Sequence, residues 1–283
     1  MTANAEQNTV LVTAATGKTG RRVAARLRTL GTPVLAGSRT PGSGAGEVVF
    51  DWESPATWPP AVQGVTSVYV AFYPDLAAPG AVEAMSAFGR VAAAQGVQRL
   101  VLLSGRGEPE AVVAEDALRE SGVPLTVVRA AFFAQNFSEG VLADSVAQGA
   151  IAFPGEQTPE PFIDVDDLAD VVVAALTEDG HLGRTYEITG PRLLTFGQAA
   201  TELGAALGRE VKYLPVSENE FAALLQQVGF PEPDAAWLAA LCTMLMGGHN
   251  ASTTDTVREV LGREAKDFVD FARDAVVEGA WKE

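Results

Sequence analysis

The sequence is poor in residues that bind metals or form disulfides. It has one cysteine, Cys242, and two histidines, His181 and His249, among 283 residues. A single cysteine excludes an intrachain disulfide and is typical of a reducing compartment. Cys242 lies in the apolar run 237–246, which favours a buried packing thiol over a nucleophile. Because the histidines and the cysteine are widely separated, we expect no metal site.

Long apolar runs and an excess of positive charge are also missing. No apolar segment reaches the roughly 18 residues that a membrane helix requires, and residues 1–7 lack the basic region and apolar core of a signal peptide. The net charge of −16 opposes binding to nucleic acid or to an anionic membrane. We therefore expect a cytoplasmic protein that acts on a small-molecule substrate. The residues leave the oligomeric state open, with a homodimer as one candidate.

The sequence does have alternating strand-like and helix-like segments, and 47% of its residues are hydrophobic, enough for a sizeable core. The predicted strands are residues 10–12, 33–38, 48–50, 65–72, 99–104, 125–129, 185–189 and 211–214. The predicted helices are residues 21–30, 110–121, 138–148, 168–176, 195–207, 218–228, 234–246, 254–261 and 265–278, and an apolar-rich segment at 79–95 separates the fourth and fifth strands. Crossover segments between strands predict an α/β fold with a doubly wound parallel Rossmann sheet. We expect residues 1–150 to form its core, and residues 151–283 to complete the sheet and form a smaller, mostly helical C-terminal lobe.

The first predicted strand is followed by a turn that is typical of a dinucleotide-binding site. Glycines in such a turn let the backbone approach a pyrophosphate, and the N–H groups of the next helix point at its charge. The same turn also occurs as a bare connector. Ala14 stands where the commonest pattern has its first glycine, so we expect it to keep φ below zero. The expected cofactor contacts here are Thr13, Ala15, Thr16, Gly17, Lys18, Thr19 and Gly20.

Arg39 indicates which cofactor binds. The residue that closes the second strand of such folds meets the adenosine ribose, where an acid suits NAD and an arginine suits a 2′-phosphate. A guanidinium can donate two hydrogen bonds to phosphate at once. We therefore expect NADPH, unless Arg39 is only a solvated loop residue. Asp51 and Trp52 are expected at the adenine, and Ala71 and Phe72 along the cofactor's path.

Several segments together carry a family resemblance. They are Thr13-Ala-Ala-Thr-Gly-Lys-Thr-Gly20, Leu102-Leu-Ser-Gly105, Glu115-x-x-Leu118-x-x-Ser-Gly122, Thr126-Val-Val-Arg129 and Phe132-Phe-Ala-Gln-Asn-Phe137. As a set they resemble the NmrA-like subgroup of atypical short-chain dehydrogenases/reductases, which includes type-2 quinone oxidoreductases, a fungal NADP-sensing regulator and the festuclavine/agroclavine synthases. The resemblance spans about residues 8–214. It implies an NADP(H)-bound Rossmann core with the substrate over the nicotinamide.

The chain departs from ordinary members of that superfamily in its proton relay. They carry Tyr-x-x-x-Lys in the helix after the fifth strand, whereas residues 107–118 contain neither tyrosine nor lysine. Alcohol–ketone chemistry by the usual relay is therefore not expected. We expect an NADPH-dependent reductase whose acceptor is already electrophilic, such as an imine or iminium ion, a quinone or an activated alkene. The alternative is a non-catalytic protein that senses NADP(H).

The aromatic segment 132–137 is the expected substrate site. Phe132 and Phe133 are suited to hold a flat substrate and Asn136 to orient it. The alternative for the phenylalanines is packing in the core of the lobe.

Three residues are candidates for proton transfer. Ser104 occupies the position of the superfamily's catalytic serine and is also expected to contact the cofactor. Tyr73 follows the fourth strand, and His249 lies in a glycine-rich loop of the lobe; both are also expected to contact the substrate.

Overall fold

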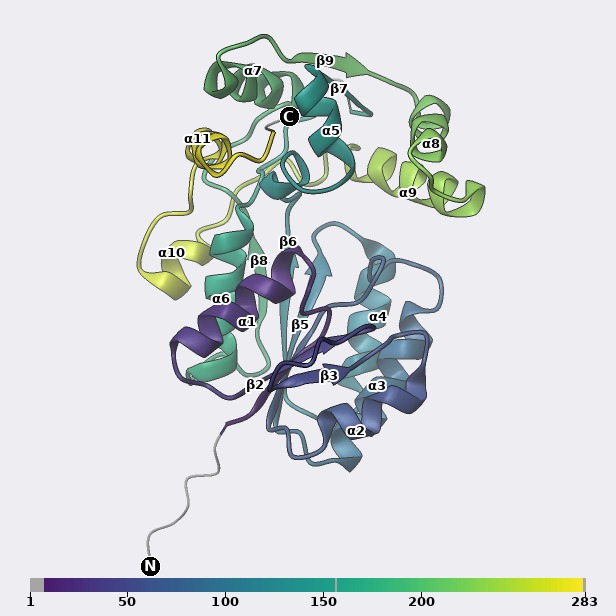
Figure 1. The fold of residues 1–283 in the computed structure, drawn as a ribbon, viewed down its shortest axis with the longest axis vertical. Helices are drawn as coiled ribbons and strands as arrows, with labels where there is room; N and C mark the ends of the chain where they lie inside the picture. The colour runs from purple at the N-terminus through teal and green to yellow at the C-terminus, as the bar shows by residue number, and fades with distance from the viewer. Residues whose placement is uncertain (1–7, 156, 282–283) are drawn as a thin grey trace, which may run out of the picture. The chain divides into compact units, whose positions relative to one another are not determined.

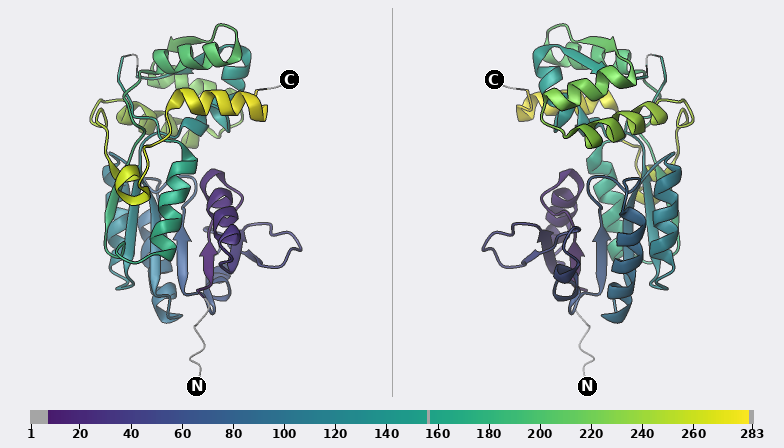
Figure 2. Two further views of the ribbon diagram at one scale, coloured as in Figure 1. Left: turned by 90° about the vertical axis from the view of Figure 1, so that its left-hand side faces the viewer. Right: turned by 90° about the vertical axis from the view of Figure 1, so that its right-hand side faces the viewer.

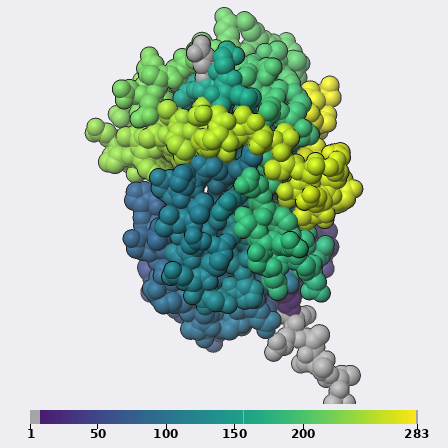
Figure 3. Space-filling model, turned by 180° about the vertical axis from the view of Figure 1, so that it is seen from behind, coloured from purple at the N-terminus to yellow at the C-terminus, as the bar shows by residue number. Residues whose placement is uncertain are grey.

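A computed structural model describes residues 8–155 and 157–281. The chain forms two compact units: unit 1 consists of Met1–Ala130 and Asp166–Glu187, and unit 2 of Ala131–Val165 and Ile188–Glu283. Figure 3 shows the discontinuity of unit 1, because green atoms of its second segment lie against blue atoms of its first. The boundary expected at residue 150 falls within unit 2, since the chain leaves unit 1 after residue 130 and returns to it for 166–187.

Unit 1 contains a seven-stranded sheet in the order β3-β2-β1-β4-β5-β6-β8. Its strands are β1 (Val10–Val12), β2 (Val34–Ser38), β3 (Glu47–Val49), β4 (Ser67–Val70), β5 (Arg99–Gly105), β6 (Leu125–Ala130) and β8 (Thr185–Ile188). All pairings from β3 through β6 are parallel. The strand order reverses between β1 and β4, so the doubly wound Rossmann fold expected from the sequence is confirmed. Ligands of such sheets bind beyond the carboxyl ends of the strands, near this reversal.

Helices cover both faces of the sheet (Figure 1). On one face lie α1 (Lys18–Thr29) and α6 (Val165–Thr177); on the other lie α2 (Trp58–Val62), α3 (Ala81–Ala94) and α4 (Pro109–Arg119), with the 3₁₀ turn η1 (Pro55–Thr57) before α2. Two ion pairs tie α1 to α6, because Arg26 contacts Asp166 at 2.7 Å and Asp170 at 2.5 Å. The helix after the first turn is thus fixed to its neighbour on the same face of the sheet.

The helices on the opposite face are held by an apolar stripe. In α3, Met85, Phe88 and Ala92 are buried at a spacing of three and four residues, which places them on one side of the helix. They pack in one cluster with Leu100 and Leu102 of β5. Burial of each large side chain contributes about 1.5–3 kcal/mol, so this cluster fixes the strand ends at which the candidate site lies.

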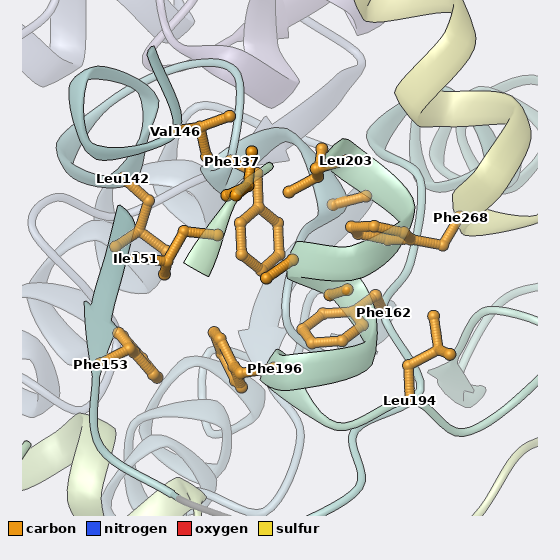
Figure 4. Close-up of a cluster of buried hydrophobic side chains, with 14 of the residues drawn as sticks. Phe137, Leu142, Val146, Ile151, Phe153, Phe162, Leu194, Phe196, Leu203 and Phe268 are labelled. Carbon is orange, nitrogen blue, oxygen red and sulfur yellow. The ribbon is translucent and has the colours of Figure 1, made fainter. Parts of the chain in front are cut away.

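Unit 2 is mostly helical, as expected. Its elements are the 3₁₀ turn η2 (Ala134–Asn136), α5 (Val141–Gln148), β7 (Ala150–Phe153), α7 (Phe196–Leu207), β9 (Lys212–Pro215), α8 (Glu218–Gln227), α9 (Glu232–Leu245), α10 (Thr256–Leu261) and α11 (Phe268–Glu278). β7 and β9 pair in parallel. Phenylalanines dominate the core: Phe153 and Phe196 stack with ring centroids 4.3 Å apart, and Phe137 meets Phe268 edge-on at 5.5 Å (Figure 4). These ring contacts join β7 to α7, and the residue after η2 to α11.

The connection between β2 and β3, residues 39–46, projects as a loop in both side views (Figure 2). Arg39 is the first residue of that loop and is exposed. Within residues 8–155 and 157–281, none of the helices combines the length and the apolar character needed to cross a bilayer.

Candidate functional site

The turn after β1 differs from expectation at Ala14. Its φ is +49°, in the left-handed region, so the expectation of a negative φ is wrong. The Ala14 carbonyl accepts a hydrogen bond from the Gly17 N–H at 2.9 Å, and Ala15 donates its N–H to the Gly37 carbonyl in β2 at 2.9 Å. These bonds hold the turn in a conformation that costs an alanine about 1–2 kcal/mol. Backbone strain of this kind clusters at functional sites.

The two glycines allow α1 to approach this turn closely. A Cβ at Gly20 would overlap the Ala14 carbonyl, and a Cβ at Gly17 would lie 3.2 Å from the same oxygen. Gly17 is the N-cap of α1, no side chain in the described part of the chain caps it, and the first turn of α1 has no acidic residue. The N–H groups of a helix start with these properties form an anion site. The turn therefore fits the pyrophosphate of a dinucleotide.

Several residues expected along the cofactor's path are anchored by bonds within unit 1. Thr13 is buried, and its hydroxyl accepts the Ala71 N–H at 2.8 Å, which joins β1 to the end of β4. The Trp52 indole N–H donates to the Ala71 carbonyl at 2.9 Å, and its ring lies 5.2 Å from that of Phe72. Asp51 accepts the Glu53 N–H at 3.1 Å. These contacts stiffen the edge of the sheet near the strand reversal.

Arg39 and Tyr73 meet at this edge. The Arg39 guanidinium carbon lies 5.8 Å from the centroid of the Tyr73 ring, a cation–π contact. Tyr73 is 68% exposed. In the described residues, Arg39 has neither an ion-pair partner nor a hydrogen-bond acceptor, whereas Arg26 of α1 is paired with carboxylates. The guanidinium donors therefore remain available to an anionic ligand.

Ser104 belongs to a buried network near the end of β5. Its hydroxyl donates to Glu115 Oε1 at 2.6 Å, and Glu115, which is fully buried, also accepts two hydrogen bonds from Arg129 at 2.9 and 2.7 Å. These bonds to Glu115 raise the pKa of the Arg129 guanidinium. The Ser104 hydroxyl is thus engaged in supporting α4 and β6, and its expected contact with cofactor or acceptor stays a prediction.

A pair of carboxyl groups that the sequence analysis missed lies beyond the same strand ends. Asp75 follows β4, and Glu108 follows β5 and precedes α4. The two carboxyl groups interact, and each affects the pKa of the other. Burial, and then the charge of Asp75, raise the pKa of Glu108 well above its usual range. Burial also raises the pKa of Asp75, whose carboxylate accepts the Ala77 N–H at 2.8 Å.

The N-terminus of α4 does not bring the raised pKa of Glu108 back to its usual range. Glu108 is the N-cap of α4, but its side chain makes no capping hydrogen bond. A helix N-terminus stabilises an anion by about 0.3–1 kcal/mol, which is less than the roughly 1.4 kcal/mol that corresponds to one pKa unit. Two buried carboxyl groups in direct contact do not both ionise near neutrality. Burial and the neighbouring Asp75 charge thus favour the protonated form of Glu108.

The aromatic segment expected at the substrate divides into core and non-core residues of unit 2. The Phe132 ring packs edge-on against Phe153 and Phe196, each at 5.5 Å, and Phe137 is fully buried. Figure 4 shows Phe137 in the middle of this core. For Phe132 and Phe137 the structure thus shows the packing role.

Phe133, Asn136 and His249 differ from those core residues. Phe133 and Asn136 are half-buried, and Phe133 contacts no other aromatic ring among the residues that the structure describes. His249 is exposed in the loop between α9 and α10. These three side chains keep surface with which a substrate can interact, so their expected role remains open to test.

The described ranges contain no group of three or more histidine, cysteine, aspartate or glutamate residues placed to hold a metal ion. Cys242 is buried in the core cluster of unit 2, in line with a packing thiol.

Comparison with known proteins identifies the family. The NAD(P)H-binding family matches residues 14–179, and the NmrA-like family matches residues 111–272. The chain belongs to the NmrA-like family. An agroclavine dehydrogenase of Claviceps fusiformis is 31% identical over 94% of this chain and 96% of its own length. An NAD(P)H azoreductase of Xenophilus azovorans is 30% identical over 93% of this chain and 96% of its own.

A solved structure agrees with the fold. The NADPH-dependent quinone oxidoreductase QOR2 of Escherichia coli, complexed with NADPH, aligns with a TM-score of 0.79 and 23% identity, covering 94% of this chain and 99% of its own. The resemblance inferred from the sequence motifs is therefore confirmed. The NmrA-like chain is an NAD(P)H-dependent oxidoreductase, and the dehydrogenase and the azoreductase to which it is similar are named as enzymes, which favours catalysis over the sensing alternative.

Proposed function

We propose that the protein is an NADPH-preferring reductase that transfers hydride to a small planar or cationic organic acceptor without a tyrosine–lysine relay. The acceptor class is an imine or iminium ion, a quinone or an activated alkene. The observation that carries the cofactor preference is Arg39, an exposed guanidinium without a carboxylate partner in the described residues, at the position where an acid would select NADH.

Residues of unit 1 are suited to hold this cofactor. The close approach at Gly17 and Gly20 and the uncapped start of α1 fit a pyrophosphate, and Arg39 fits the additional phosphate of NADPH. Tyr73 supports the Arg39 side chain through its ring. When bound, NADPH supplies the hydride; the residues of the chain bind it, orient it and exclude water.

The acceptor class rests on two arguments. First, α4 carries neither tyrosine nor lysine, so a strongly basic alkoxide product has no relay to protonate it. Second, relatives named as an azoreductase and a quinone oxidoreductase support an acceptor with a conjugated, polarised double bond. We propose Phe133, Asn136 and His249 as substrate contacts, keep Tyr73 and Ser104 as candidates for proton transfer, and assign Phe132 to the core.

The test combines binding and turnover. Dissociation constants for NADPH and NADH are measured by titration, and NADPH oxidation is then followed with quinones, cyclic imines, N-alkylated cyclic iminium ions and enones. We expect NADPH to bind at least about tenfold more tightly than NADH, since one charge-assisted hydrogen bond is worth about 1.5 kcal/mol or more. Equal affinities would overturn the cofactor preference, and no turnover with any acceptor would overturn the reductase proposal.

A further inference from the structure

The carboxyl groups of Asp75 and Glu108 follow two neighbouring strands of the parallel sheet. β4 and β5 pair in register, Val70 opposite Leu102, and Asp75 and Glu108 come a few residues after the ends of these strands. The carboxyl ends of parallel strands next to the order reversal are where catalytic groups of this fold lie. The pair is therefore well placed to act in the reaction.

The backbone directs the Glu108 side chain to this place. Gly105 has no Cβ, and one built there would overlap the Glu108 carboxyl group. Gly107 has φ +78°, which turns the chain tightly after the strand. Pro109 restricts the residue before it to extended backbone, and Glu108 has φ −104° and ψ 100°. The carboxyl group thus lies against Gly105 instead of capping α4.

Glu108 is unsatisfied where it lies. It is only 6% exposed, and its Oε2 has no hydrogen-bond partner among the described residues. Three acids raise its pKa: Asp75 from the loop after β4, and Glu110 and Glu115 from α4. A buried acid with one oxygen unpartnered and acidic neighbours destabilises the fold, and such groups concentrate at functional sites.

We propose that Glu108 is the catalytic acid of the reduction, with Asp75 as the positioning residue that keeps it protonated. This role rests on the proposed reductase function. As the acceptor gains hydride, the O–H bond of Glu108 breaks, and its proton forms a new O–H bond on a quinone or N–H bond on an imine. The resulting Glu108 carboxylate regains a proton from solvent through the half-buried Asp75. An iminium ion becomes a neutral amine by hydride addition alone and needs no proton.

The first test compares Glu108→Gln with wild type on two acceptors. Glutamine keeps the size of the side chain and a donor toward Asp75 but has no acidic proton. We expect kcat with a quinone or cyclic imine to fall about a hundredfold, the usual contribution of a general acid. With an N-alkylated iminium ion, we expect the kcat of Glu108→Gln to stay within about twofold of the wild-type value. The affinity of the variant for NADPH should also stay within about twofold of wild type. The matched control is Glu120→Gln, an exposed acid at the C-terminal end of the same helix, for which kcat stays within about twofold of wild type on both acceptors.

The second test uses Asp75→Asn and a pH profile. The acid form of Glu108 is required, so kcat with a quinone falls on the alkaline side of neutrality in wild type. Removing the charge of Asp75 lowers the proton affinity of Glu108, so in the variant this fall moves to lower pH while kcat on the acid side is kept. A purely structural role for Asp75 would leave the midpoint unchanged. This test decides the proposal if Glu108→Gln does not fold.

A third measurement needs neither cofactor nor turnover. Above about pH 4.3 an unfolded chain has lost this proton, whereas the folded chain retains it. Unfolding then releases a proton, and the contribution of Glu108 to stability declines as pH rises. The difference between the Tm of Glu108→Gln and the Tm of wild type should therefore increase in favour of the variant as pH rises from about 5 to about 8.

The outcomes separate this role from the function on which it rests. Equal losses with quinone and iminium acceptors, no loss with either, or parallel Tm curves would overturn the role of Glu108. If wild type reduces none of the acceptors, the proposed function fails first and the catalytic role falls with it, even where the Tm curves show a retained proton.

Discussion

Replacement of Gly20 by alanine should damage both stability and NADPH binding, because the new Cβ has no room. It would overlap the Ala14 carbonyl oxygen, and would lie 2.8 Å from the Ala14 carbonyl carbon and 3.0 Å from the Ala15 Cα. All three are backbone atoms, so they cannot rotate aside as the tip of a flexible side chain can. Either α1 moves away from the turn or the turn changes conformation.

The magnitude follows from that obstruction. Extra atoms in a well-packed region cost about 1–3 kcal/mol, and a clash with backbone places Gly20→Ala near roughly 2–3 kcal/mol. For a domain of this size each kcal/mol lowers the Tm by roughly 2–4 °C, which predicts a fall of about 4–12 °C. Displaced N–H groups at the start of α1 would also lose charge-assisted hydrogen bonds worth about 1.5–3 kcal/mol. The Kd for NADPH should therefore rise about ten- to a hundredfold.

Two further glycines provide a graded comparison. A Cβ at Gly17 would lie 3.2 Å from the Ala14 oxygen, which requires only a small shift, whereas at Gly197 in α7 the nearest atom is 3.7 Å away. Melting curves and NADPH fluorescence titrations should rank Gly20→Ala as the most damaged and Gly17→Ala as intermediate. Gly197→Ala should be unaffected in binding and stabilised by about 0.5–1 kcal/mol. If Gly20→Ala had the same Tm and the same Kd for NADPH as wild type, the close approach of α1 to this turn would be refuted.

The remaining predictions concern charged side chains. Arg39→Ala should weaken NADPH binding about ten- to a hundredfold and leave NADH within about twofold; calorimetric titration that shows equal losses would contradict the phosphate role. Arg129→Met should cost about 3–5 kcal/mol in urea denaturation because it leaves the buried Glu115 carboxylate uncompensated, whereas Glu115→Gln should cost less. Arg192 holds the pKa of Asp267 below its usual range, so the stability from this pair is present above about pH 4 and lost as pH falls further. Asp267→Asn should lower stability by roughly 0.5 kcal/mol at neutral pH, and a gap in Tm that does not narrow as pH falls below about 4 would contradict that assignment.

Much of unit 1 could be predicted because each element carries its own local signal. The strand expected at 99–104 corresponds to β5, and the helix expected at 110–121 corresponds to α4. The helix α2 was missed because Pro59 and Pro60 suggest a break. At the first positions of a helix, proline removes only an N–H that has no partner there anyway. Similarly, prolines at 154, 159 and 161 concealed β7, which ends just before them.

A feature of the candidate site was predictable from the sequence only where it depends on the position of a single residue. The expectation for Arg39 rests on its position after a strand, and the structure places it there, exposed and without a carboxylate partner in the described residues. The φ of Ala14 was misjudged because the bonds from Gly17 and to Gly37 that hold it involve other segments. Glu108 was missed for the same reason, since its proton depends on burial and on Asp75 in a separate loop. The available signal was an acidic residue between a strand end and a proline.

The acid pair and the missing tyrosine–lysine pair are two solutions to one physical problem. A proton donor works best when its pKa is near the working pH. A tyrosine starts near 10 and needs a cation beside it to lower its pKa, whereas a glutamate starts near 4.3 and needs burial or a second carboxylate to raise it. Glu108 has both, and the charges of Glu110 and Glu115 add to the effect. A lysine in α4 would remove the proton from Glu108, so the absence of lysine in that helix agrees with a carboxyl group as the proton donor.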